Sequence, residues 1–153
     1  MRKSNVGRNR LLAAVALIAC LCMMILAGCT GVSRSADKPV LEEATVVRVV
    51  DGDTLVADVD GQDEKIRLIG VDTPESVNPD ASKNTERGKE ASENTKAILT
   101  KGKSVWLEAD AQDKDKYNRK LRYEWLEKPT DPNSREEAES KMLNAVLVKD
   151  GWA

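Results

Sequence analysis

Histidine is missing from all 153 residues of the chain, and the three cysteines lie within the first 29. Without histidine, a Ser-His-Asp triad and any histidine-ligated metal are excluded. Beyond Cys29 no thiol remains for a disulfide, a zinc site or a nucleophile. Any chemistry must therefore use carboxylates, guanidinium groups, amines, hydroxyls and cations that prefer oxygen ligands.

The N-terminal segment combines a basic start with a long apolar run. Residues 1–10 hold basic but no acidic side chains, and residues 11–28 are all apolar or small. This order is typical of a secretory signal peptide. The final residues of the run, "LAGC", resemble a bacterial lipobox, in which cleavage precedes the cysteine and its thiol carries a diacylglycerol. We therefore expect residues 1–28 to be a lipoprotein signal peptide and Cys29 to be lipidated.

The alternative to a lipobox is a retained membrane-spanning helix, since 18 residues are borderline long enough to cross a bilayer. Both interpretations put the rest of the chain outside the cytoplasm. Residues 29–43 are mostly polar or small, which favours a flexible tether between lipid and domain. We expect an exported lipoprotein, anchored to the membrane on the outer face of the cytoplasmic membrane or in the cell envelope.

The charge of the exported part differs from that of the whole chain. Four of the 24 basic residues and none of the 26 acidic ones lie in the first 29 residues, which leaves the remainder near −6 instead of −2. No basic surface for coating nucleic acid is expected from this balance. An anionic substrate would have to meet a local group of cations or a bound metal.

The remaining sequence predicts one domain, residues 44–153, with alternating strands and helices. Three Val-rich runs separated by "DGD" and "GQD" indicate strands joined by turns. A polar loop follows over residues 75–88, then a helix over 89–102 that ends at Gly102. Residues 103–110 and 120–127 indicate two more strands, and a capping box begins a second helix over residues 134–151. The order favours an α+β fold dominated by a five-stranded sheet or closed OB-like barrel with two helices.

Several polar residues stand where these strands begin or end. Taken singly, each has an ordinary explanation: a hairpin turn accounts for Asp51 and Asp53, and a solvent-facing strand position accounts for Arg67. Together they provide what a phosphodiester hydrolase needs. Asp53 and Asp72 offer hard oxygens for Ca²⁺, and Arg67 and Arg119 offer planar forks for phosphate. Glu75 could take a proton from water.

The motifs "DGDT", "IRL", "GVDTPE" and "DKYNR", in this order, resemble the staphylococcal nuclease family of thermonuclease-like OB-barrel enzymes, from about Val46 to Ala153. The resemblance implies a Ca²⁺-dependent nuclease that cuts DNA and RNA with little sequence preference and leaves 3′-phosphate ends. We also expect the protein to be a monomer.

The same resemblance implies roles for individual residues. Asp53, Asp72 and the main-chain carbonyl of Thr73 would bind Ca²⁺, and Asp51 would orient bound water. Arg67 and Arg119 would bind the scissile phosphate, and Glu75 would be the general base or would position the attacking water. Lys116 and Tyr117 would contact the nucleotide.

Two departures from the family pattern leave alternatives open. Residues 127–140 form a longer connection than the family has there, and the family's third C-terminal helix is absent from a chain that stops at Ala153. We therefore expect weaker substrate binding and lower stability than in a longer relative. The alternatives to an active enzyme are a catalytically silent OB-fold module that binds nucleic acid or protein, and an inactive truncated remnant.

Overall fold

The computed structural model describes residues 39–153, so the predicted signal peptide, Cys29 and most of the predicted tether lie outside the described residues. Residues 39–153 belong to one unit with its own core. Its elements are the strands β1 (Leu41–Asp51), β2 (Thr54–Val59), β3 (Gln62–Leu68), β4 (Ser104–Lys114) and β5 (Lys120–Trp125), the 3₁₀ turn η1 (Ala81–Lys83), and the helices α2 (Glu86–Ile98), α3 (Arg135–Lys141) and α4 (Leu143–Lys149). The first strand thus begins three residues before the predicted domain start.

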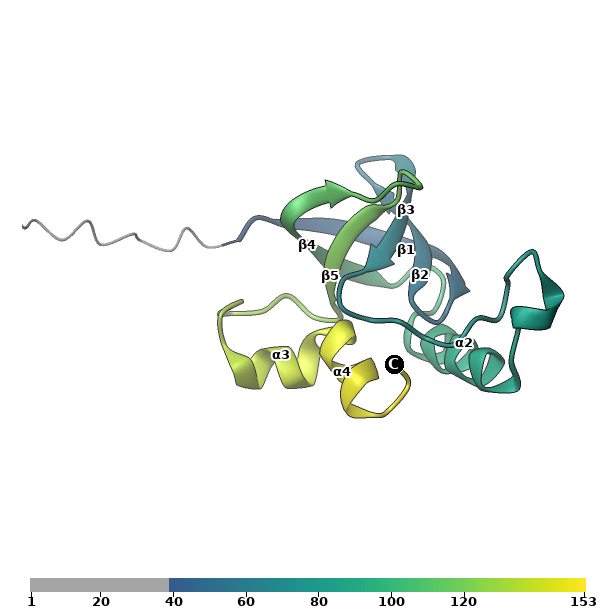
Figure 1. Ribbon diagram of the computed structural model, residues 1–153. Coiled ribbons are helices and arrows are strands. Elements are labelled where there is room, and N and C mark those ends of the chain that lie inside the picture. The colour runs from purple at the N-terminus through teal and green to yellow at the C-terminus, as the bar shows by residue number, and fades with distance from the viewer. Residues whose placement is uncertain (1–38) are drawn as a thin grey trace, which may run out of the picture. The chain divides into compact units, whose positions relative to one another are not determined.

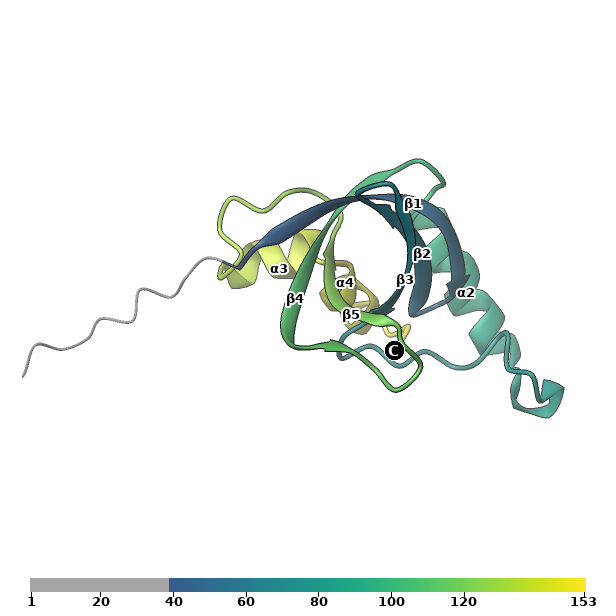
Figure 2. The ribbon, with the colours of Figure 1, turned by 90° about the horizontal axis from the view of Figure 1, so that it is seen from above.

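The five strands close into a barrel in the order β1-β2-β3-β5-β4, which Figure 2 shows as a ring seen from above. All neighbours are antiparallel except β3 and β5, which run parallel over a short register. The β2–β3 hairpin turns at Asp60 and Gly61, whose positive φ angles of 53° and 80° suit a two-residue turn that follows strand twist. The predicted five-stranded OB-fold barrel is confirmed.

Aliphatic side chains fill the barrel and continue toward the helices, which lie at one end of the strands in Figure 1. Strands β1 to β4 contribute buried members such as Val46, Leu55, Ile66 and Leu107. Helix α4 adds Leu143 and Leu147, whose i and i+4 spacing puts them on one face. Strand β5 adds none to this apolar cluster.

The predicted second helix is in fact two helices, so the described residues hold three α-helices where two were expected. Met142 leaves helical geometry (φ −86°, ψ 116°) and forms a β-bridge with Trp125, while the Leu126 amide donates to the Lys141 carbonyl. A long-range pairing with β5 therefore interrupts the helix that local periodicity predicts. Ser134 caps α3 as expected, accepting a hydrogen bond from the Glu137 amide.

Helix α2 begins at Glu86, three residues earlier than predicted, because the Thr85 side chain caps it and accepts a hydrogen bond from the Gly88 amide. Strand β4 runs to Lys114, beyond its predicted end, with a register shift against β5 after Ala109. Within residues 39–153, no helix combines the length and apolar character needed to span a membrane.

Candidate active site

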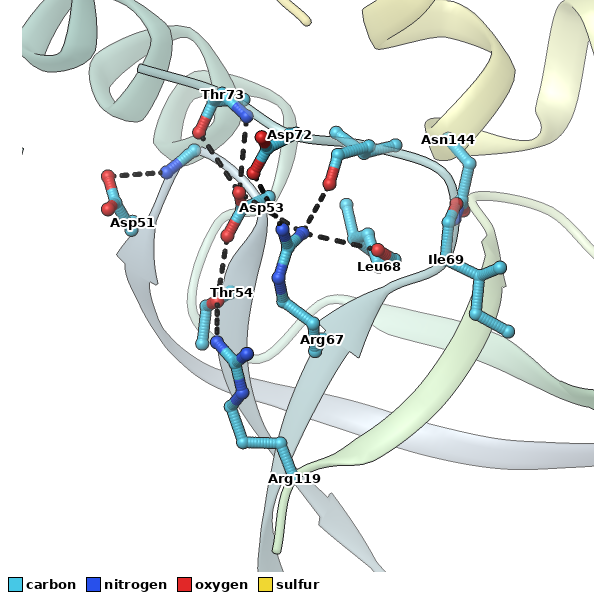
Figure 3. A network of polar contacts seen from close by, with 12 residues as sticks. Asp51, Asp53, Thr54, Arg67, Leu68, Ile69, Asp72, Thr73, Arg119 and Asn144 are labelled. Atoms are coloured by element: carbon cyan, nitrogen blue, oxygen red, sulfur yellow. Dashed lines mark hydrogen bonds and ion pairs between the residues drawn. The ribbon is translucent and has the colours of Figure 1, made fainter. Parts of the chain in front are cut away.

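The carboxylate of Asp53 lies at the centre of a polar network between β1 and β2 (Figure 3). It is buried, and its Oδ2 atom accepts hydrogen bonds from the Thr73 amide at 3.2 Å and the Thr73 hydroxyl at 3.3 Å. The Thr54 hydroxyl donates to Oδ1 at 2.8 Å. These donors hold the two carboxyl oxygens in one orientation, which is the arrangement that a hard cation or an arginine can use.

Arg67 of β3 points between Asp53 and Asp72, as Figure 3 shows. Its Nη1 atom lies 3.1 Å from Oδ2 of Asp53, and its Nη2 atom lies 3.1 Å from Oδ1 of Asp72. Nη1 also donates to the carbonyl oxygens of Leu68 and Val71 at the strand end. The Asp72 side chain is 96% exposed, so its ion pair is screened by water and contributes little stability. Asp72 can therefore exchange Arg67 for another cation at small cost.

Arg119 is held by the tight turn that precedes β5. Its Nε donates to Asp115 at 2.7 Å, and the other oxygen of Asp115 accepts the amides of Tyr117 and Arg119. Burial opposes ionisation of Asp115, but these hydrogen bonds keep its pKa below the ordinary value. The left-handed backbone of Asn118 (φ 62°) completes the turn. A terminal nitrogen of Arg119 then reaches the Thr54 hydroxyl at 3.3 Å.

These side chains open onto one cleft of about 400 Å³. Among the described residues, the charged groups that line it are Asp51, Asp53, Lys65, Arg67, Asp72, Glu75 and Arg119. The structure thus brings together both predicted metal-binding aspartates, both predicted arginines and the predicted base. Acidic groups outnumber cations there, which suits a site that accepts an additional positive ion.

Asp51, the first acid of "DGDT", is buried beside this cleft and holds the loop that carries Glu75. Its Oδ1 accepts the Gly52 amide at 2.9 Å and the Ser76 hydroxyl at 2.5 Å. Gly52 is required because a Cβ there would lie 2.7 Å from the Thr73 hydroxyl oxygen. The predicted role of Asp51 in orienting water stays a prediction, whereas its hydrogen bond with Ser76 gives it a structural role in holding the loop.

Gly88, in the first turn of α2, lies directly against the loop that carries Glu75. A Cβ at this position would come within 2.1 Å of the Glu75 carbonyl oxygen, and that oxygen already accepts the Thr85 amide at 3.0 Å. Only glycine permits this backbone approach. Contacts between the main chain at the start of α2 and the main chain of Glu75 therefore fix the position of Glu75 in the cleft.

Replacing Gly88 by Ala should destabilise the protein by roughly 1–3 kcal/mol, because the clash is with backbone that cannot move aside. It should also displace Glu75, the predicted base, and so lower the nuclease activity that the sequence motifs imply. Urea unfolding of the variant measures the first effect, and digestion of denatured DNA measures the second. Helix propensity alone would give stabilisation of up to about 1 kcal/mol, so an increase in stability would contradict the close approach.

Lys116 and Tyr117, the predicted nucleotide contacts, lie outside the cleft on the turn before β5. The Tyr117 ring is 67% exposed, with the Lys116 ammonium 5.0 Å and the Arg119 guanidinium 5.4 Å from its centre. An exposed ring with two cations beside it can stack on a base. Their contact with nucleotides remains a prediction.

Sequence reasoning missed Ser76, Thr54 and Asp115, and also the buried Asn144 of α4. The Asn144 amide donates to the carbonyls of Ile69 and Arg122, and its oxygen accepts the Glu124 amide at 2.8 Å. It thereby joins the end of β3 to β5, just before the segment that carries Asp72. A polar residue on the apolar face "MLNAVL" was the available signal.

No cluster of three or more acidic or cysteine side chains in residues 39–153 forms a ready-made metal cage. The predicted calcium site supplies two carboxylates, with Arg67 between them. Both carboxylates offer the hard oxygens that Ca²⁺ prefers, and among the described residues the exposed carboxylate of Asp72 is held only by its ion pair with Arg67. The donor set therefore fits Ca²⁺, provided that carbonyl and water oxygens complete it.

Comparison with known proteins agrees with this architecture. The family described as staphylococcal nuclease homologue matches residues 65–153, more than half of the chain. The chain is 41% identical to the thermonuclease of Staphylococcus hyicus over 155 residues, covering all of this chain and 81% of that protein. It is 46% identical to the thermonuclease of Staphylococcus intermedius over 112 residues, 73% of this chain and 58% of that one.

A further relative is endonuclease YncB of Bacillus subtilis, 31% identical over 124 residues, which are 80% of this chain and 52% of that protein. The chain thus spans between about half and four fifths of the length of these relatives. The family match includes Arg67, Asp72, Glu75 and Arg119, and the full-length alignment also includes Asp53. The chain belongs to the staphylococcal nuclease family.

Proposed function

We propose that this protein is a Ca²⁺-dependent nuclease that hydrolyses phosphodiester bonds of DNA and RNA with little sequence preference, leaving 3′-phosphate ends. The observation that carries the proposal is the single cleft that Asp53, Arg67, Asp72, Glu75 and Arg119 line together. The relatives named thermonuclease and endonuclease support the same reaction class.

Calcium would be held by Asp53 and Asp72, with the Thr73 carbonyl as a further ligand. When bound, it would neutralise charge on the phosphate and polarise a water molecule. Asp53 is fixed for this role by its hydrogen bonds from Thr54 and Thr73. Asp72, exposed on the strand-end loop, would supply the second and more mobile carboxylate ligand.

Arg67 and Arg119 bind the scissile phosphate in this mechanism. Arg67 already faces two anionic groups, so phosphate oxygens replace a carboxylate as its partners. Asp115 holds the Nε atom of Arg119, so the terminal nitrogens of Arg119 point toward the cleft. Two planar forks on one phosphate stabilise the charge that develops during in-line displacement.

Glu75 accepts the proton of the attacking water. The water oxygen forms a bond to phosphorus while the bond from phosphorus to the 5′ oxygen breaks. The leaving oxygen accepts a hydrogen bond from Arg119 and takes its proton from solvent, because arginine stays charged. The Glu75 side chain is exposed, lines the cleft and forms no ion pair within residues 39–153, so its carboxylate is available as a base.

The protein acts outside the cytoplasm in this proposal, attached to the membrane through a lipid on Cys29. The support is the sequence of residues 1–29, with its basic start, apolar run and terminal "LAGC". A surface anchor would keep a monomeric nuclease beside the cell that exports it.

The purified protein should digest heat-denatured DNA in the presence of Ca²⁺ and stop when EGTA removes the metal. Arg119→Ala should be inactive under the same conditions, whereas Arg135→Ala should not differ from the wild type, since Arg135 is exposed on α3 and pairs with Glu139 of the same helix. Gel electrophoresis of timed samples measures all three. Digestion that survives EGTA, or that is equal in Arg119→Ala, would overturn the mechanism.

If no digestion occurs, circular dichroism of the same sample distinguishes the two alternatives. A folded spectrum would indicate a silent OB-fold module, and an unfolded one a remnant.

A further inference from the structure

Lys65 of β3 shares the outer face of the barrel with Arg67. Side chains two residues apart on a strand point the same way, about 6.6 Å apart along it. The β2 register agrees, with Val56 opposite Lys65 and Thr54 opposite Arg67. Lys65 is exposed and lines the same cleft as the proposed catalytic groups.

The segment that leads into strand β5 brings a third cation, Arg119, to this face. The parallel register of β5, with Ile66 opposite Lys120, places the start of β5 beside the segment from Lys65 to Arg67. Arg119 immediately precedes β5, and its terminal nitrogen crosses to the Thr54 hydroxyl on β2. Arg119 thus lies across the face of β3 on which Lys65 stands.

The three cations of the cleft differ in their partners. Arg67 pairs with Asp53 and Asp72, and Arg119 pairs with Asp115. No carboxylate of the described part of the chain lies within ion-pair distance of Lys65. A phosphate reaching Arg67 must displace a carboxylate, whereas a phosphate reaching Lys65 displaces only water and counterions.

We propose that Lys65 binds a backbone phosphate of a single-stranded nucleic acid, adjacent to the phosphate that is cut. This inference rests on the proposed nuclease function and adds a substrate contact outside the set that the family motifs suggest. The ammonium touches no reacting atom, so it contributes to substrate binding and not to the bond-breaking step. A compact ammonium is a point charge and suits a phosphate that does not need a planar fork.

Lys65→Gln in the full-length protein should raise KM for denatured DNA about five- to tenfold and leave kcat within about twofold, as expected for one lost charged contact. The matched control is Lys101→Gln, on the turn between α2 and β4, exposed and outside the cleft lining. It should leave both constants unchanged.

Binding gives a readout that does not depend on cleavage. In a Glu75→Gln background, fluorescence anisotropy of a labelled single-stranded oligonucleotide should show weaker binding for Lys65→Gln. The slope of log affinity against log salt should also fall by about 0.7, the counterion release of one phosphate contact on a single strand. Thermal unfolding of each variant checks that the fold is kept.

The outcomes separate the two proposals. A wild type that does not cut, with a Lys65 effect on binding and salt slope, would overturn the nuclease proposal and uphold the phosphate contact. A wild type that cuts, with Lys65→Gln equal to Lys101→Gln in KM and salt slope, would overturn the contact alone. A loss of kcat at constant KM would also overturn it, because Lys65 would then act in the chemical step.

Discussion

Changing Arg119 to Lys should lower kcat on denatured DNA by about 10²–10³-fold while the protein stays folded. This is the usual effect of removing one donor aimed at transition-state charge. The Nε atom of Arg119 is occupied by Asp115 at 2.7 Å, so its terminal nitrogens form the fork that faces the cleft. A lysine can keep the pairing with Asp115 or reach the phosphate as a point charge, but it cannot do both.

Steady-state kinetics of Arg119→Lys measure this effect, with Arg135→Lys as the matched control. Arg135 is 91% exposed and makes an i,i+4 pair with Glu139 on α3, so its replacement should leave kcat unchanged. The free energy of unfolding of Arg119→Lys should change by no more than about 1 kcal/mol, since only a partly exposed ion pair is altered. A kcat loss below about tenfold would argue against a bidentate role.

The second large effect concerns Glu124, the one acidic side chain that the described structure buries completely. Glu124 is 0% exposed, opposite the fully buried Leu107 of β4, and neither carboxyl oxygen has a hydrogen-bond partner among the described residues. Burial raises its pKa to about 8, and the charge of Lys103 opposes this only in part. The side chain is therefore a neutral acid at pH 7 in the folded protein.

The direction of the pH dependence follows from the two pKa values. The carboxyl binds its proton more tightly folded than unfolded, where its pKa is 4.5. Its contribution to stability is complete below about pH 4.5 and is lost as the pH rises through about 8. At about 1.4 kcal/mol per pH unit, the loss is on the order of 5 kcal/mol. That is a large share of the free energy of unfolding of an ordinary domain, which is roughly 5–15 kcal/mol.

A carboxylate whose pKa is lowered by folding has the opposite effect, because it makes the protein less stable at low pH. Asp115 is kept ionised in the fold by hydrogen bonds from Arg119 and Tyr117 that outweigh its burial, so its contribution is present above its unfolded pKa of 3.8. It is lost as the pH falls through the lower folded value. Stability should therefore be greatest in mildly acidic solution and decline toward alkaline pH.

Urea unfolding between pH 5 and 9 measures this decline directly. Glu124→Gln removes the titration and should flatten the curve, and Glu124→Met should raise the free energy of unfolding by several kcal/mol above pH 8. Glu136→Gln, an exposed change on α3, is the control and should leave the slope unaltered. Equal slopes in the wild type and Glu124→Gln would refute the buried neutral acid.

Much of the fold and the main site residues could be predicted from the sequence because the signals are local. Alternating apolar residues and turn dipeptides identified five strands within a few residues of their observed bounds. The motifs around Asp53, Asp72 and Arg119 identified the groups that the structure gathers in one cleft. Chain order and turn chemistry were sufficient for these features.

The remaining features depend on residues that only the closed barrel brings together. Met142 interrupts a helix because it pairs with Trp125, and Gly88 matters because α2 lies against the Glu75 carbonyl. Lys65 stands beside Arg119 because β3 and β5 run parallel, a pairing that no local pattern encodes. The sequence by itself determined the strands, the turns and the chemical groups, since each is encoded within about ten residues. The tertiary structure alone decided which charges are paired, which are free and which are buried, because partners and solvent access depend on segments far apart in the chain.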